Sequence, residues 1–326
     1  MRHRYPQSPP NLYQRGVALI TALIIMAIAA AIAAGMAWQG DLDERRTETL
    51  IHGDQAMEYA LGAESWAEQI MQRDFKQSPA SVNLGQDWAQ QLPPLPVEGG
   101  EITGHIEDMQ GRFNLDLLQS QGLGGAAYFA QLQRLLTLLN LDPNLAYAVS
   151  DWVNSGTVAS PNGAKDDYYS RLQPPYLTAL APMTSVSELQ LVKGITPQVY
   201  AALLPYICAI PLNVSSGVSG SIGGWSLNVN TASPLLLMSL APNIAEDQVD
   251  QVVAARETNG ISAADFSKII NVGANGGNSA VAYSVTSSYF LLTVTAQIGS
   301  THVTMYSLLR NNGGQVTAVR RTFGTL

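Results

Sequence analysis

The N-terminal stretch of the chain limits the possible folds more than any other feature. Residues 17–38 contain no charged side chain. As a helix rising about 1.5 Å per residue, this run is long enough to cross a hydrocarbon core of roughly 30 Å. The sixteen residues before it carry three arginines and no acid, whereas Asp41, Asp43 and Glu44 follow it. The positive-inside rule therefore predicts a cytoplasmic N-terminus, with everything after residue 40 across the membrane.

A secretory signal peptide is the alternative interpretation of this run. Its alanine-rich end, residues 27–37, offers small residues for cleavage, which would give a soluble exported protein starting near residue 35. Signal peptides, however, have apolar cores of about 7–15 residues, and this chain continues to residue 75 without a proline. We therefore expect one helix over residues 17–77, with a transmembrane part at 17–40 and a stalk at 41–77. Ser78-Pro79 ends it.

Small residues recur on one face of the predicted stalk. Ala56, Ala60, Ala63 and Ala67 follow one another at three- and four-residue steps, which is the spacing of a helix face. Such a seam lets another helix approach closely. The alternative is that the seam packs against a sheet of the same chain, and the pattern leaves both interpretations open.

The remainder of the chain predicts an α+β fold. Residues 78–115 combine a proline-rich linker with alternating apolar residues at 102–106, and residues 281–326 contain three β-rich runs separated by Gly-Ser and Asn-Asn-Gly-Gly turns. These runs predict a small antiparallel sheet packed on the stalk. Residues 116–280 are mainly helical in periodicity and form a large insertion. Helices are expected at 128–139, 143–154, 185–192, 197–207, 233–241, 245–259 and 263–270.

Composition excludes several classes of function. Beyond the leader, 14 basic side chains face 25 acidic ones, which disfavours nucleic acid as a partner because phosphate binding depends on Lys and Arg. The single cysteine, Cys208, excludes an internal disulfide, and the four histidines show no zinc spacing. No Ser–His–Asp set or phosphate-binding glycine loop occurs, so we predict no enzymatic activity.

The leader resembles that of type IV pilins and pseudopilins, because a short basic segment ends in Gly16 and the apolar helix starts at Val17. The resemblance implies that prepilin peptidase cuts between these two residues and methylates the new amine. Most members of that family carry Glu at the fifth mature position, where this chain has Thr21. A carboxylate in lipid costs about 2.5 kcal/mol or more without a partner. The absence of the glutamate therefore implies a filament tip, where no subunit stacks above.

The motifs GRFNLDLL, DWVNS, GAKDDYYS, LLPYICAIP and LNVNTASP, in that order, resemble the K minor pseudopilin family of type II secretion systems. The resemblance implies a pilin-like fold carrying an inserted all-helical, helix-hairpin-helix (SAM-like) domain. It also implies a tip subunit that initiates or caps the pseudopilus for export of folded proteins. The implied partners are minor pseudopilins I, J and H and the inner-membrane platform. The implied location is the bacterial inner membrane, single-pass, with the bulk periplasmic. The expected divisions are 1–16, 17–40, 41–77, 78–115, 116–280 and 281–326.

A calcium site is predicted in the segment DWVNSGTVASPNGAKDDYYS, where Asp151, Asn154, Asp166 and Asp167 offer oxygen ligands on an irregular loop. The resemblance implies calcium here, but related K subunits carry Asp in place of Asn154 and Glu in place of Lys165. The lysine removes one ligand and adds a positive charge, so calcium affinity should fall. The alternative is a solvated acidic loop with helix caps.

A second family resemblance leads to a different function. Residues 228–273 resemble a helix-hairpin-helix DNA-binding module of the competence-receptor type, which seats a phosphate on the amides of Gly-x-Gly hairpins. Here the hairpins are 242–244, 271–273 and 193–196, and none contains Gly-x-Gly or a Lys/Arg cluster. We therefore keep a membrane-anchored DNA receptor as the alternative function and predict no nucleic-acid partner.

Overall fold

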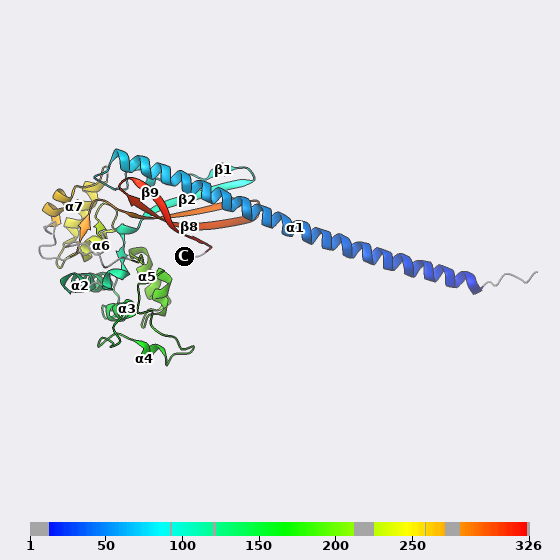
Figure 1. Cartoon of the computed structure of the whole chain (residues 1–326), viewed down its shortest axis with the longest axis horizontal. Helices are drawn as coiled ribbons and strands as arrows, with labels where there is room; N and C mark the ends of the chain where they lie inside the picture. The colour runs from blue at the N-terminus through cyan, green and yellow to red at the C-terminus, as the bar shows by residue number, and fades with distance from the viewer. Residues whose placement is uncertain are drawn as a thin grey trace, which may run out of the picture.

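The computed structural model describes residues 13–91, 93–119, 122–211, 225–257, 259–270 and 281–324. One very long helix, a five-stranded antiparallel sheet and a region of short helices make an α+β protein (Figure 1). The N-terminal half of the long helix extends far beyond the rest of the molecule, and the short helices lie near its other end.

Helix α1 spans Tyr13–Gln77 without interruption, about 100 Å at the usual rise. It starts four residues earlier than the sequence indicated, and the four added residues include no proline that would stop the helix. All residues from 17 to 51 are exposed, and the first fully buried side chain is Ala56. The helix thus has a bare half, followed by a half that belongs to the core. Residues 1–12 of the predicted leader lie outside the described residues.

The sheet has the strand order β1-β2-β7-β8-β9, and each neighbouring pair is antiparallel. The strands are β1 (Leu95–Val97), β2 (Gly100–Asp108), β7 (Tyr289–Ile298), β8 (Thr301–Asn312) and β9 (Gln315–Phe323). The predicted strands are confirmed, and both predicted turns connect them. Gly313 and Gly314 have φ of 60° and 87°, which the primed hairpin turn requires. Strand β1 was not expected, and its Pro96 is tolerated because β1 is the edge of the sheet.

One face of the sheet packs on the second half of α1. Residues of β7 are buried alternately, so that Phe290, Leu292 and Val294 face the helix. Phe290 contacts the rings of Phe75 and Trp88 at centroid distances of 5.3 and 5.2 Å. This cluster is the smaller of two hydrophobic cores in the described part of the chain.

Strands β2 and β7 are hydrogen-bonded neighbours, although most of the chain lies between them in sequence. That intervening segment holds the second and larger core. The α-helices are α2 (Gly122–Leu138), α3 (Leu145–Val153), α4 (Asp166–Tyr169), α5 (Pro197–Leu203), α6 (Pro234–Ser239), α7 (Glu246–Arg256) and α8 (Ala263–Ile270). Short 3₁₀ helices are η1 (Asp87–Ala89), η2 (Met109–Gly111), η3 (Leu115–Gln119), η4 (Val186–Leu191) and η5 (Leu204–Tyr206). The same segment contains two pairs of parallel strands, each strand two residues long: β3 (Phe113–Asn114) pairs with β4 (Ile207–Cys208), and β5 (Leu227–Asn228) pairs with β6 (Tyr283–Ser284).

Most expected helices are confirmed, with two differences. The segment at 185–192 forms the 3₁₀ helix η4, whose Ser185 and Glu188 make a reciprocal capping box, instead of an α-helix. The helix expected at 197–207 divides into α5 and η5, because Pro205 cannot donate a backbone hydrogen bond.

Candidate functional site

The predicted processing point, Gly16 and Val17, lies inside the first turns of α1. Thr21, one turn later, donates its hydroxyl to the backbone carbonyls of Val17 at 3.1 Å and Ala18 at 3.0 Å. The hydroxyl is therefore satisfied within its own helix and needs no partner in lipid. The helix is long and apolar enough to cross a membrane.

The alanine seam of the stalk is mostly occupied by the chain's own sheet. Ala56 and Ala60 are completely buried and Ala67 nearly so, all in the core shared with β7 and β8. These three alanines are not available to a neighbouring helix, so the structure supports the own-sheet interpretation for them. Ala63 is half-buried and lies at the margin of that contact.

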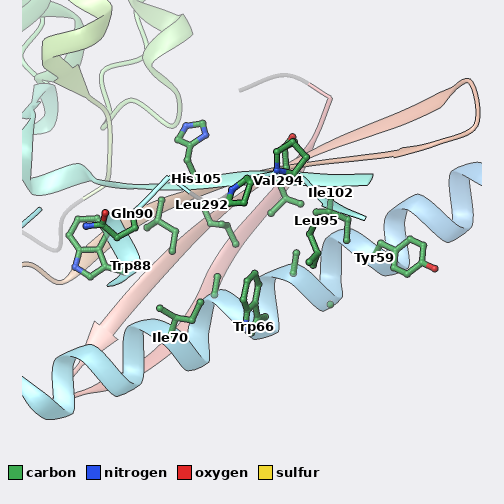
Figure 2. Close-up of a pocket in the computed structure, with 18 of the residues that line it drawn as sticks. Tyr59, Trp66, Ile70, Trp88, Gln90, Leu95, Ile102, His105, Leu292 and Val294 are labelled. Atoms are coloured by element: carbon green, nitrogen blue, oxygen red, sulfur yellow. The ribbon is translucent and has the colours of Figure 1, made fainter. Parts of the chain in front are cut away.

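An apolar groove opens beside the seam, between α1 and the β1–β2 edge of the sheet (Figure 2). Trp66 stands on the side of α1 that faces the strands, and 46% of it is exposed. The apolar lining comes from the helix, from β1 and β2, and from β7: Tyr59, Ala63, Trp66, Ile70, Leu95, Val97, Ile102, Ile106, Leu292 and Val294. Polar groups are few and include His105 and Gln90.

Sequence reasoning missed this groove. Tyr59, Ala63, Trp66 and Ile70 follow at helical spacing on the face next to the alanine seam, and this second stripe could have indicated a second contact surface. Its other wall is β1, which was taken as linker.

An ion pair between a buried acid of α1 and an arginine whose side chain is 47% exposed fixes the stalk to the far edge of the sheet. Glu64 of α1 accepts hydrogen bonds from Arg321 of β9 at 2.7–3.0 Å and from Ser307 of β8. The carboxylate raises the pKa of Arg321. A buried carboxylate is tolerated when donors surround it in this way. The pair therefore holds β9 against the helix.

The four predicted calcium ligands lie around the end of α3 and the start of α4. Both carboxylate oxygens of Asp151 accept hydrogen bonds from Ser160, at 2.8 and 2.9 Å. The amide of Asn154 donates to the backbone carbonyls of Leu118 and Ser150.

The other two predicted calcium ligands, Asp166 and Asp167, do not join Asp151 and Asn154 in a common site. Asp166 accepts from the backbone and hydroxyl of Thr178, which lower its pKa, and Asp167 is exposed. In the part of the chain that the structure describes, no three His, Cys, Asp or Glu side chains are grouped to hold a metal.

The hairpins of the DNA-binding alternative are only partly described. Residues 271–273 lie outside the described ranges. Residues 242–244 connect α6 to α7, with Asn243 at φ 63° in the place where glycine would be expected. The nearby Arg134 donates to the carbonyls of Ser239 and Leu240, so its charge serves the C-terminus of α6.

A long helix that is apolar at its start and packed on an antiparallel sheet at its end defines a class of α+β protein that can be anchored in a membrane by its N-terminus. Comparisons with known proteins identify the family within that class. Two family models, both described as type II secretion system (T2SS), protein K, match residues 111–212 and 227–286.

Full-length relatives agree with the family models. Type II secretion system protein K of Pectobacterium carotovorum subsp. carotovorum is 34% identical, over 95% of this chain and 97% of its own. The protein of the same name from Klebsiella pneumoniae is 34% identical, over 96% and 98%.

A solved structure shares the fold. The chain matched in the crystal structure of the GspK-GspI-GspJ complex from enterotoxigenic Escherichia coli has a TM-score of 0.66 at 22% identity, over 86% of this chain and 100% of that one. The chain belongs to the type II secretion system protein K family, the minor pseudopilins GspK, which are structural proteins and not enzymes. The predicted family, and with it the minor pseudopilin function, is confirmed, and the DNA receptor is set aside.

Proposed function

We propose that this chain is the tip subunit of a pseudopilus and initiates or caps the filament with minor pseudopilins I, J and H. The uncharged span around Thr21 is the observation that carries this proposal. A carboxylate there would need a cation from a subunit above it, and the internally bonded hydroxyl of Thr21 needs none. The bulk of the short helices lies at the end of the molecule opposite the N-terminus, where a following subunit would have to stack (Figure 1).

The finer architecture fits this role. The sheet and stalk form a pilin-like unit, and residues between β2 and β7 form a helix-hairpin-helix (SAM-like) insertion. The turn at Gly194, with φ 81° before the Thr196-capped α5, supports that description. The chain is held in the inner membrane by a single span, with its N-terminus cytoplasmic and its bulk periplasmic. There it meets the inner-membrane platform of the secretion system.

The groove beside Trp66 is the proposed contact surface for the partner pseudopilins. It is apolar and lies along α1 from Tyr59 to Ile70, beyond the bare half of the helix that partner helices would follow in the membrane. The structural neighbour forms a complex with GspI and GspJ, which supports the same partners for this chain.

Prepilin peptidase cuts the leader between Gly16 and Val17 and methylates Val17 in this proposal. N-terminal sequencing of the membrane-extracted protein should give Val17 as the first residue. Gly16→Trp should leave the leader uncut because a bulky side chain blocks the scissile position. Gly35→Trp should be processed normally, because it lies away from the scissile bond and a Cβ added at Gly35 meets nothing within 4 Å. A first residue near position 35 would contradict the proposal.

Tip placement can be tested with the chain's single cysteine. Cys208 is 1% exposed and its burial raises the pKa of its thiol, so the unmodified chain should not react with maleimide. Val158→Cys adds a thiol at a site that is 85% exposed. Maleimide-gold on filaments containing this variant should mark one end only. Gold along the whole filament would refute a tip subunit, and the unmodified chain is the labelling control.

A further inference from the structure

The loop of residues 154–165 connects α3 to α4 and closes over a buried lysine. Lys165 is only 5% exposed, and its ammonium donates to the backbone carbonyls of Asp151 and of Asn154, the latter at 2.6 Å. The two acceptors belong to the last turn and the C-cap of α3. Lys165 therefore brings a positive charge from the far end of the loop to the end of that helix.

The carbonyls at a helix C-terminus have no partner inside the helix and carry its negative partial charge. A cation at this position satisfies them, and a side chain that supplies it also ties down the loop to which it belongs. Burial lowers the pKa of Lys165 below its usual value, and the carboxylates of Asp151 and Asp166 offset only part of that lowering. Two acids and two carbonyls thus form a negative environment around a single ammonium group.

The residues at this place do not fit a calcium ion. Calcium takes six to eight oxygens, but both carboxylate oxygens of Asp151 are used by Ser160, and the amide of Asn154 turns its donors to other carbonyls. The two carbonyls that a cation could use are already bonded to the ammonium.

A second lysine secures the same loop from outside. Lys193 donates to the carbonyl of Gly163 at 3.0 Å and lies 5.3 Å from the ring centre of Tyr168. A Cβ on Gly163 would come within 1.7 Å of an Asp151 carboxylate oxygen, so the loop backbone passes directly over that acid. The loop is therefore closed on both sides by contacts within the chain.

We propose that the ammonium of Lys165 is the resident cation of this loop, so that this chain orders residues 154–165 without a divalent metal. From the sequence, Lys165 is a lost ligand that weakens calcium binding; in the folded chain its ammonium takes the place of the ion. This inference does not depend on where the subunit sits in the filament.

The full-length protein in detergent provides the first test. Its Tm should be the same in EDTA, in millimolar calcium and in millimolar magnesium. A rise in Tm with calcium but not with magnesium would overturn the proposal. This measurement needs no variant, so it decides the matter even where substitutions impair folding.

Variants of Lys165 supply the second test. Lys165→Met keeps the length of the side chain but leaves two carbonyls unpaired, and should lower the Tm by about 5 °C. Lys268→Met is the control, since that lysine is 75% exposed and its loss should leave the Tm unchanged. Equal Tm values for Lys165→Met and the control would contradict the proposal.

Lys165→Glu reverses the charge at the same place. It frees the two carbonyls and adds a carboxylate next to Asp166, which creates an oxygen site where the ammonium was. This variant should melt lower than the wild type in EDTA and recover part of the loss in calcium. Indifference of Lys165→Glu to calcium would mean that the loop holds no cation position, and would also overturn the proposal.

Discussion

Asp116 shows how a single buried side chain can link stability to pH. It is 2% exposed, one carboxyl oxygen accepts from the backbone of Met183 at 2.8 Å, and the other has no hydrogen-bond partner in the part of the chain that the structure describes. Burial, with a smaller contribution from the charge of Glu188, raises its pKa to about 7. The folded state therefore favours the protonated carboxyl.

The sign of the pH effect follows from that shift. Between about pH 4 and 7 the carboxyl of Asp116 is protonated in the folded chain but largely ionised in the unfolded chain. The contribution of Asp116 to the free energy of unfolding therefore falls as pH rises, by roughly 4 kcal/mol in total. Asp116→Asn should remove this slope. The Tm of the variant relative to wild type should thus be higher at pH 8 than at pH 5. Parallel Tm curves for the two proteins would show that Asp116 does not titrate in this range.

At the level of elements, α1 presents two neighbouring faces: Ala60 lies on the face packed against the sheet, and Trp66 lies on the face that lines the groove. Trp66→Ala should weaken binding of minor pseudopilins I and J about tenfold or more, because exposed tryptophans in apolar grooves are typical interface anchors, while the Tm stays close to wild type. Ala60→Leu should instead lower stability by about 1–3 kcal/mol, since Ala60 is fully buried against the sheet. Co-purification and thermal unfolding separate the two effects. Unchanged binding by Trp66→Ala would remove the groove as the contact surface.

The elements that could be predicted from the sequence are those with a long repeating pattern. Helix α1 and strands β7, β8 and β9 have clear periods and turn residues. Strands β1 and β3 to β6 are only two or three residues long, too short for any period, and exist because tertiary contacts select them. The ion pair of Glu64 with Arg321 joins residues that are 257 positions apart, so no local sequence pattern predicts it.

The candidate sites divide in the same way. Gly16, Val17 and Thr21 could be proposed from the sequence because a leader and an apolar run are local features. The groove could not be predicted from the sequence, because its walls come from segments that are far apart in the chain. The hydrogen bonds from Lys165 to the carbonyls at the end of α3 could not be predicted, because they depend on the direction of the lysine side chain. The sequence indicated only that a lysine lies close to several acidic residues.

For the whole molecule, a buried acid, Asp108, links the two hydrophobic cores. Asp108 ends β2 and is buried at the junction between sheet and helical region, with 7% of it exposed. Its carboxylate accepts from Ser287 and Thr231 at 2.6 Å each and from Asn228 at 2.9 Å. Burial raises the pKa of Asp108, and these hydrogen bonds oppose that rise. Because Asp108 belongs to the sheet and its donors belong to the segment between β2 and β7, this one acid links the two cores.

Removing that acid should separate the cores. Asp108→Ala removes the acceptor of four donors, namely the hydroxyls of Ser287 and Thr231, the side-chain amide of Asn228 and the backbone amide of Gln110, and should cost about 3 kcal/mol or more. Because each core is contiguous on its own, we expect calorimetry of the full-length protein in detergent to show one transition for the wild type and two for the variant. Asp265→Ala, which removes an exposed acid paired with Lys268, should melt like the wild type. A single transition at the wild-type temperature for Asp108→Ala would mean that the sheet contacts between β2 and β7, rather than this acid, carry the coupling, and the helical region would then unfold only together with the stalk.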